Sequence, residues 1–232
     1  MTYVTTSFTA ADILPLHAFL STPTGQIVSM QARDIVQTQG QPTIRPCEIL
    51  HGTALVTCHS RKWGEAVIDI IGPGTLVGAP MLDGVSPRAD CTITAATDLR
   101  LLPLTDENLN LVTRRMSEEL ARQHRRRLTL AQASALERVA SFLLQLASPP
   151  CQRGMACNGC ALLGQIVTIP VSRREMGSLL ALTVETLSRC FAKLKQDQII
   201  DLSTPSLVTV LDPKALMELG GDGDIGCPRL EG

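Results

Sequence analysis

The sequence predicts an α+β protein with an N-terminal antiparallel β-roll, one long helix and a C-terminal unit of short helices and strands. Short β-branched segments separated by glycine and proline fill residues 26–104, as is typical of antiparallel strands joined by turns. Helix formers dominate residues 106–147, which contain neither glycine nor proline. Beyond Gln165, strand-like runs flank two short segments with helical spacing. We therefore expect three parts, 1–105, 106–133 and 134–232.

The composition limits the classes of partner. The chain of 232 residues is 44% hydrophobic and only 3% aromatic, and its formal net charge is −1. No global field therefore attracts nucleic acid, so a polyanion site needs a local concentration of Lys and Arg. The sequence shows neither the basic start and apolar run of a signal peptide nor a membrane-spanning stretch. We expect a soluble cytoplasmic protein without membrane contact, in which the eight cysteines are thiols, metal ligands or redox groups rather than structural disulfides.

The first part contains two clear strand candidates, Val67–Ile71 and Cys91–Ala95. Turns are expected at Gly72–Gly74 and at Gly84, and the close spacing of the strands indicates an antiparallel roll or barrel. We predict a roll of the cupin or cyclic-nucleotide-binding type. Three cysteines lie in strand-like segments and are expected in the core, namely Cys47, Cys58 and Cys91.

The run of helix formers is longer than an ordinary surface helix, so we expect a long helix and a second one, with a bend near Leu130–Ser134. Its narrow apolar stripe indicates packing against a partner helix, as in a homodimer. We expect the run Arg125–Arg127 to be a solvated face or to pair with Glu118, Glu119 and Glu137. The predicted dimerisation residues follow helical spacing and are Leu109, Val112, Met116 and Leu120.

The third part has the order of a winged helix-turn-helix. The segment VSRREMGSLLA predicts a helix with a capping box, Ser172 followed by Glu175. A tight break at Ala181 and Leu182 precedes a second helix, for which Thr183 is a suitable N-cap. The runs IIDL and LVTVL then predict a β-hairpin. In this motif the second helix lies in the major groove of DNA.

The second helix has two chemically different sides. We assign Val184, Leu187, Phe191 and Leu194 to the core side. On the opposite side, Glu185 can accept from cytosine N4, Arg189 can donate to guanine O6 and N7, and Ser188 can reach a base or a phosphate. The alternative is an ordinary solvated helix with an i,i+4 ion pair. The predicted phosphate contacts are Arg173, Arg174, Thr183, Lys193 and Lys195.

The stretch SRREMGSLLALTVETLSRCFAKLKQDQII resembles the DNA-reading unit of the Crp/Fnr family of bacterial transcription regulators, and within it the Fnr/FixK branch. By this resemblance, Glu185, Ser188 and Arg189 match the base-reading E-x-x-S-R positions. The resemblance implies a homodimer on double-stranded DNA with a TTGAT-type inverted repeat. It also implies activation through RNA polymerase in an oxygen, redox or nitrogen-oxide response. One departure is Ala181, where the family often has glycine.

The sensor half departs from the family's cofactor sites. Cyclic-nucleotide members carry a Gly-Glu pair and later an Arg-Ser or Arg-Thr pair. Here Gly78 is followed by Ala79, and Arg88 by Ala89, which argues against cyclic-nucleotide binding. No cysteine precedes Cys47, so the N-terminal iron–sulfur ligands of Fnr do not carry over. The segment 75–87 contains no histidine of the kind that binds haem in the carbon monoxide sensors.

Three thiols, Cys151, Cys157 and Cys160, lie in a Pro/Gly-rich interruption. They could be plain reduced thiols, a disulfide switch, or ligands to zinc or an iron–sulfur cluster that lacks a fourth ligand. The alternative function is therefore a metal- or haem-dependent sensor of the same fold, although the sequence requires no cofactor.

For Cys190 and for the two histidines of the first part, a purely structural role is the alternative to a functional one. Cys190 beside Arg189 is a redox thiol or a buried inert one. His51 and His59 are more typical of structural residues than of ligands. We find no nucleophile–base set, phosphate loop or paired carboxylates, and we predict that the protein is not an enzyme.

Overall fold

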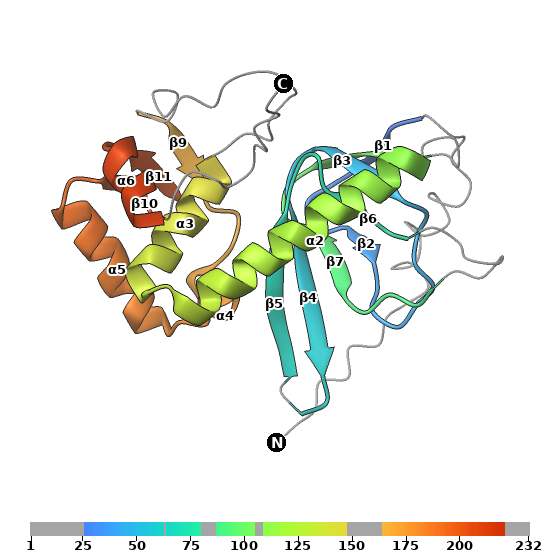
Figure 1. Ribbon diagram of the computed structural model, residues 1–232, viewed down its shortest axis with the longest axis horizontal. Helices are drawn as coiled ribbons and strands as arrows, with labels where there is room; N and C mark the ends of the chain where they lie inside the picture. The colour runs from blue at the N-terminus through green and yellow to red at the C-terminus, as the bar shows by residue number, and fades with distance from the viewer. Residues whose placement is uncertain (1–25, 63, 80–86, 105–108, 148–163, 221–232) are drawn as a thin grey trace. The chain divides into compact units, whose positions relative to one another are not determined.

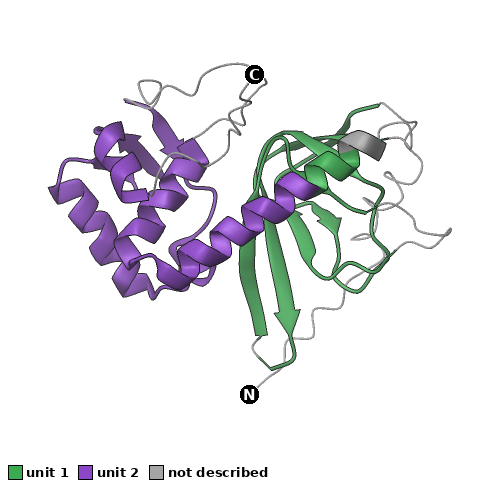
Figure 2. Cartoon of the chain, in the orientation of Figure 1, with its two compact units in different colours: residues 1–116 green, residues 117–232 purple. Residues whose placement is uncertain are grey.

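The computed structural model describes residues 26–62, 64–79, 87–104, 109–147 and 164–220. The chain divides into two compact units, residues 1–116 and 117–232 (Figure 2). The first unit is built mainly of antiparallel strands, and the second is mainly helical with one small sheet (Figure 1). The predicted α+β class is confirmed, and each unit is described by itself below.

The first unit contains two four-stranded antiparallel sheets, which confirms the predicted β-roll. One has the order β1-β8-β3-β6 and the other the order β2-β7-β4-β5. The longest ladder joins β4 to β5, from Ala54 opposite Ile71 to Ser60 opposite Gly64. The eight strands are Val28–Met30, Ile35–Gln37, Cys47–His51, Ala54–Ser60, Gly64–Ile71, Leu76–Val77, Thr92–Ala95 and Leu99–Pro103 for β1 to β8.

The core of the roll is aliphatic, as the low aromatic content predicts. Alternate strand residues turn inward, so that β3 buries Cys47 and Ile49 while β8 buries Leu99 and Leu101. Gly52 has φ +87°, and a Cβ atom there would lie 2.0 Å from the carbonyl oxygen of Asp98. This turn between β3 and β4 therefore requires glycine.

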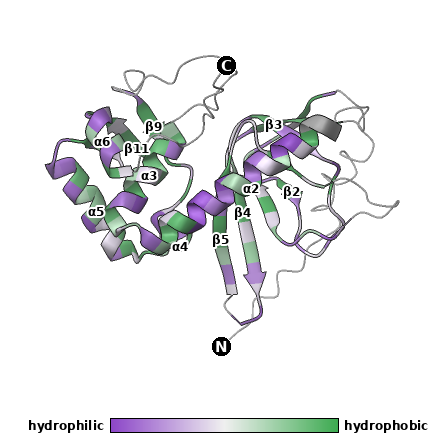
Figure 3. Cartoon of the chain, viewed as in Figure 1, coloured by the Kyte–Doolittle hydropathy of each residue, from purple (hydrophilic) through white to green (hydrophobic). Residues whose placement is uncertain are grey.

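Two helices, α2 at Leu109–Gln132 and α3 at Ala135–Ala147, replace the single run of helix formers. The predicted bend near 130–134 is confirmed. A second capping box begins α3, because the amide of Glu137 donates to Ser134 Oγ at 3.3 Å and the amide of Ser134 donates to Glu137 Oε2 at 2.6 Å. Figure 3 shows α3 as largely hydrophobic and much of α2 as hydrophilic.

The second unit has the predicted helix-break-helix-hairpin order. Strand β9 at Ile166–Thr168 precedes helices α4 at Arg173–Leu180 and α5 at Val184–Gln196. Strands β10 at Ile200–Thr204 and β11 at Leu207–Val210 form the hairpin, and β9 joins the other side of β11. Helices α3, α4 and α5 supply the core of this unit with Val139, Leu143, Met176, Leu187 and Leu194.

The sequence analysis missed helix α6 at Pro213–Gly220. Asp212 caps it, because its side chain accepts from the amide of Ala215 at 3.0 Å, and Pro213 occupies the first helical position. Leu216 is fully buried. The sequence pair Asp212-Pro213 could have indicated the start of this helix. The helix is only about two turns long, so its apolar spacing was too short to be recognised. Across the part of the chain that the structure describes, no helix has the length and apolar character to cross a membrane.

Candidate nucleic-acid interface

The start of α4 is fixed by the predicted capping box. Ser172 Oγ accepts from the amide of Glu175 at 3.2 Å, and Glu175 Oε2 accepts from the amide of Ser172 at 2.7 Å. At the other end, Ala181 has left-handed dihedral angles, φ 53° and ψ 46°. The amide of Leu182 donates to the carbonyl oxygen of Gly177 at 2.9 Å, which closes the helix end.

Gly177 lets the chain after the turn approach α4 closely. A Cβ atom on Gly177 would lie 2.7 Å from the carbonyl oxygen of Leu182. Thr183 then caps α5, because its Oγ1 accepts from the amide of Thr186 at 3.1 Å. The direction of α5 after the turn therefore depends on Ala181–Thr183 and on the absence of a side chain at Gly177.

The buried side of α5 consists of Leu187, Cys190, Phe191 and Leu194. Val184, which the sequence analysis placed on this core side, is instead 48% exposed. It is the first residue of the helix, and its apolar side chain lies beside the polar surface. Val184 is thus a surface residue that pattern reasoning assigned wrongly.

The exposed side of α5 brings Glu185 and Arg189 together. Glu185 Oε1 lies 2.5 Å from Arg189 Nη2, and the two side chains are 73% and 77% exposed. Ser188 donates its hydroxyl to the carbonyl oxygen of Val184 at 2.9 Å and keeps its own lone pairs available. The side of α5 that faces water thus presents an acid, a hydroxyl and a guanidinium within one turn.

The cations predicted to contact phosphates lie in different environments. Lys193 Nζ is 2.8 Å from Asp197 Oδ1, and Lys195 Nζ is 2.9 Å from Asp201 Oδ1. The hydrogen bond from Lys195 lowers the pKa of the Asp201 carboxyl. Arg174 is exposed. These groups form a local set of cations despite the overall charge of the chain.

Arg173 differs from the other cations because its guanidinium carbon lies 3.7 Å from the centroid of the Phe191 ring. Burial lowers the pKa of this guanidinium, which nonetheless stays protonated near neutral pH. This stacking joins α4 to α5. The N–H donors of a guanidinium lie in its plane, so the stacked group can still donate hydrogen bonds from its edge.

Cys190 is buried on the core side of α5, with 8% exposure. Burial raises the pKa of its thiol. The neighbouring Arg189 therefore does not produce a thiolate, and the alternative of a buried inert thiol is favoured.

The predicted dimerisation stripe is partly used within the chain itself. Val112 is buried with 5% exposure, whereas Met116 and Leu120 are 51% and 56% exposed. Leu128, which the sequence analysis omitted, is 58% exposed on the same helix. The side chain of Leu109 lies outside the described part. Among the described side chains of α2, the exposed large apolar residues that a partner could contact are Met116, Leu120 and Leu128.

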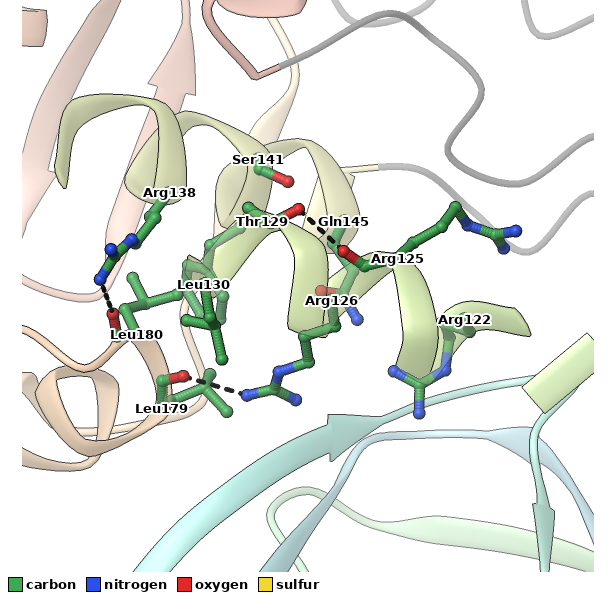
Figure 4. A pocket seen from close by; sticks show the side chains of 11 residues that line it. Arg122, Arg125, Arg126, Thr129, Leu130, Arg138, Ser141, Gln145, Leu179 and Leu180 are labelled. Atoms are coloured by element: carbon green, nitrogen blue, oxygen red, sulfur yellow. Dashed lines mark hydrogen bonds between the residues drawn. The ribbon is translucent and has the colours of Figure 1, made fainter. Parts of the chain in front are cut away.

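The arginines of α2 have partners that the sequence analysis did not foresee. Arg122 pairs with Glu119 at 2.6 Å, whereas Arg126 Nη2 donates to the carbonyl oxygen of Leu179 at 3.1 Å (Figure 4). The carboxylate of Glu137 belongs to the capping box of α3 rather than to the basic run. Arg126 is thus more than a member of a solvated face, because it ties α2 to the end of α4.

In the roll, two described residues of the segment compared with the cyclic-nucleotide cassette, Ala79 and Arg88, bond main-chain carbonyl oxygens. The amide of Ala79 donates to the carbonyl oxygen of Ile44 at 3.0 Å, and Arg88 Nη1 donates to the carbonyl oxygen of Gly40 at 2.6 Å. Ala89 is buried with 4% exposure. Arg88 is thus engaged as a loop tether, and Ala79 offers no side-chain acceptor for a ribose.

The cysteines of the roll are free thiols. Cys47 is fully buried, which raises its pKa to about 12, while Cys58 and Cys91 are only half-buried. His51 and His59 are exposed. Among the described residues, no group of three or more His, Cys, Asp or Glu side chains could hold a metal ion. The predicted cluster Cys151, Cys157 and Cys160 lies outside the described residues.

The second unit matches a known domain. Residues 137–219 match the family described as the Crp-like helix-turn-helix domain. The chain is 34% identical over 106 residues to the transcriptional activator protein FnrA of Stutzerimonas stutzeri. This stretch covers 46% of this chain and 40% of FnrA, so the match spans less than half the length of that relative. It is 29% identical over 213 residues to the transcriptional activator protein FnrL of Cereibacter sphaeroides, covering 86% of this chain and 83% of FnrL.

The fold of the chain also matches solved structures. A CRP/FNR-family transcriptional regulator from Thermus thermophilus superposes with a TM-score of 0.67 and 24% identity, over 84% of this chain and 98% of that one. This likeness concerns the fold of the chain, whereas the family match identifies residues 137–219 as a Crp-like helix-turn-helix domain. The similarity to relatives named FnrA and FnrL is in line with the resemblance of the E-x-x-S-R stretch to the Fnr/FixK branch.

Proposed function

We propose that the protein is a sequence-specific regulator of transcription that binds double-stranded DNA as a homodimer. The carrying observation is the exposed pair of Glu185 and Arg189 on the helix that follows the turn. In the helix-turn-helix geometry this helix enters the major groove, where the carboxylate accepts from cytosine and the guanidinium donates to guanine. Ser188, whose own proton is bonded to the helix, would act there as an acceptor.

The phosphate contacts in this proposal come from the edges of the same helix pair. Arg174, Thr183, Lys193 and Lys195 are all exposed, and Arg173 contributes the N–H donors of its stacked guanidinium, of which Nη1 also donates to Met176 Sδ at 3.7 Å. Such contacts fix the position of the protein on the duplex without reading its sequence. The specificity is expected to come from α5 and much of the affinity from the cations.

The proposed operator is a TTGAT-type inverted repeat, since two recognition helices related by a twofold axis read two half-sites. The dimer would form through α2, where Met116, Leu120 and Leu128 are exposed apolar residues. FnrA and FnrL are named as transcriptional activators, and on that ground we propose activation, with RNA polymerase as a further partner. By the same likeness we propose a role in an oxygen, redox or nitrogen-oxide response and a cytoplasmic location.

The test is a fluorescence-anisotropy titration of the full chain with a TTGAT-N4-ATCAA duplex and with a scrambled duplex of equal composition. We expect preference for the palindrome by roughly 10³-fold or more, and a strong decrease in affinity for both duplexes as salt rises. Equal affinity for the two duplexes at both salt concentrations would remove the base-reading role.

A further inference from the structure

The sheet with the order β2-β7-β4-β5 brings two cysteines together at the end of one ladder. Strand β4 pairs antiparallel with β7, and the last partners in this ladder are Thr57 and Thr92. One residue further towards the same end, Cys58 follows Thr57 and Cys91 precedes Thr92. The antiparallel register therefore places the two cysteines opposite each other. Both belong to the first unit, whereas the proposed DNA contacts all lie in the second.

The side chains of the two cysteines lie on the same side of the sheet. Side chains alternate along a strand, so Cys58 shares its side with the buried Val56, and Cys91 shares its side with the buried Ile93. Val56 and Ile93 are themselves partners in the ladder, and Cys91 packs against the core of the roll. Opposite neighbours on one side of a ladder have Cβ atoms about 4.5–5.5 Å apart, which is close to the distance that a disulfide needs.

The hydrogen bonds of the ladder identify the kind of pair that the cysteines form. The amide of Ala96 donates to the carbonyl oxygen of Thr53, which lies opposite it in the register, at 2.8 Å. Hydrogen-bonded and non-hydrogen-bonded pairs alternate along an antiparallel ladder. Cys58 is five residues after Thr53, an odd number, so its pair with Cys91 is of the non-hydrogen-bonded kind. The Cα atoms of such a pair are about 4.5 Å apart, within the roughly 4.4–6.8 Å that a disulfide spans.

Beyond the two cysteines, side chains replace the main-chain bonds of the ladder. The amide of His59 donates to Gln39 Oε1 at 2.7 Å, and Gln39 Nε2 donates to the carbonyl oxygen of His59 at 3.2 Å. The thiol of Cys58 donates to the carbonyl oxygen of Asp90 at 3.4 Å. The planar peptide places this oxygen beside the Cα atom of Cys91, so Cys58 Sγ lies within about 6 Å of that atom.

The two thiols can be reached from water and differ in their protonation. Cys58 and Cys91 are half-buried, whereas Cys47 in the same roll is fully buried. Burial and, after it, the charge of Asp90 raise the pKa of the Cys91 thiol to about 12. Cys91 therefore stays protonated near neutral pH. Since the thiolate is the reactive form of cysteine, Cys58 is the sulfur that reacts first with an oxidant.

We propose that Cys58 and Cys91 form a reversible disulfide and are a redox-active dithiol of the roll. The oxidant is a hydroperoxide. The thiolate of Cys58 attacks one peroxide oxygen and the O–O bond breaks, which leaves a sulfenic acid on Cys58 and releases an alcohol, or water from hydrogen peroxide, after the leaving oxygen takes up a proton. The sulfur of Cys91 then displaces water from the sulfenic acid and loses its proton, which forms the S–S bond.

The reaction is balanced by one peroxide for each disulfide. The two thiols lose two electrons and two protons, and the peroxide accepts them. Two molecules of a small thiol reverse the reaction by thiol–disulfide exchange and are themselves joined as a disulfide. Oxidation would close the end of the ladder with a covalent bond between β4 and the residue before β7. The proposal concerns the first unit alone and requires no DNA binding, so it stands or falls independently of the proposed regulator function.

The experiment treats the full chain with hydrogen peroxide and blocks the remaining thiols with N-ethylmaleimide. Disulfides are then identified by mass spectrometry of a tryptic digest prepared without a reductant. The expected product joins the peptides 34–61 and 89–100, which contain Cys58 and Cys91. We expect this product from more than about half of the molecules, and its loss after treatment with dithiothreitol. Absence of the linked peptides, or their formation only in urea-unfolded protein, would overturn the proposal.

The sulfur in the first peptide has to be assigned, because residues 34–61 also contain Cys47. Cys58→Ser is expected to abolish the link to peptide 89–100, whereas Cys47→Ala is the control that keeps it. Thermal unfolding checks that both variants are folded. Fragment ions of the linked wild-type peptides separate Cys47 from Cys58 and make the same assignment without a substitution. A link that persists in Cys58→Ser, or fragment ions that place it on Cys47, would sink the proposed pair.

Discussion

The guanidinium of Arg189 lies 2.5 Å from the carboxylate of Glu185, although each side chain is about three-quarters exposed. An ion pair so open to water stabilises a helix by only about 0.3–0.5 kcal/mol. The pair therefore contributes little to folding, and its value lies in holding two groups of opposite charge at a fixed spacing. In the proposed complex they match the two bases of a G·C pair, with the carboxylate at cytosine N4 and the guanidinium at guanine O6 and N7, all on the major-groove edge.

Arg189→Ala is predicted to lower the discrimination between matched and scrambled operators by about 1–3 kcal/mol, because the bidentate contact with guanine is lost. The thermal stability should hardly change. Anisotropy titrations with both duplexes measure the effect. Lys214→Ala is the control, since Lys214 also faces an acid four residues away, Glu218 at 4.0 Å, but lies on α6. A uniform loss of affinity on both duplexes would argue against base reading by Arg189.

Lys193→Ala is predicted to weaken binding to matched and scrambled duplexes alike, because a phosphate contact carries no sequence information. The slope of log K against log salt should become less steep by roughly 1 or less. The change can be less than 1 because Lys193 already pairs with Asp197, and on binding DNA it replaces this carboxylate with a phosphate. Titrations at several salt concentrations give this slope. A selective loss on the palindrome would instead assign a base contact to Lys193.

Ala181→Gly is predicted to raise the free energy of unfolding by about 0.5–1 kcal/mol. The left-handed conformation of Ala181 costs an alanine roughly 1–2 kcal/mol, and the greater entropy of glycine in the unfolded chain offsets part of the gain. Ala192→Gly, an exposed position inside α5, should instead destabilise by about 1 kcal/mol. Urea unfolding of both variants checks the opposite signs, and a loss of stability in Ala181→Gly would contradict the cap geometry.

Leu120→Glu is predicted to convert the proposed dimer into a monomer. Leu120 is 56% exposed, so a charge there is tolerated by the folded chain but not by a helix-to-helix contact. Gln132→Glu at the last residue of α2 should leave the assembly unchanged. Light scattering after size exclusion reports the mass of each protein. A dimer that persists in Leu120→Glu would place the interface elsewhere.

The stability of the roll is predicted to fall at alkaline pH through Cys47. Its pKa is raised by burial from 9.0 to about 12, so the folded state keeps a proton that the unfolded state releases. The stabilisation is complete below pH 9 and is lost progressively as the pH rises towards 12, by at most about 1.4 kcal/mol per pH unit. Urea unfolding should show a shallower pH dependence for Cys47→Ala than for the wild type, and an unchanged pH dependence would contradict this role of Cys47.

Short-range features of the second unit could be predicted from the sequence because their causes are local. The capping box needs only Ser172 and Glu175, and the break at Ala181 follows from the end of one apolar pattern and the start of another. Val184 was assigned wrongly for a related reason. Periodicity identifies a side of a helix, but it does not show where along that side the core ends.

Features that depend on contacts distant in the sequence could not be predicted. The pairing of β1 with β8 joins Val28 to Leu101, and nothing local to either strand specifies it. Arg126 looked like one member of a solvated basic run, yet it bonds a carbonyl oxygen 53 residues later in the chain. The partners of such residues depend on tertiary packing, and the sequence offered only their charge.

Helix α6 has a consequence for how far a fragment of the second unit must extend. Its last residue, Gly220, comes so near α3 that an added Cβ would lie 2.4 Å from a methyl carbon of Leu144. A fragment truncated after the hairpin would lack α6 and would expose to water the apolar surface of α3 that α6 covers. A fragment of the second unit that ends at the hairpin is therefore expected to be less stable than one that extends through Gly220.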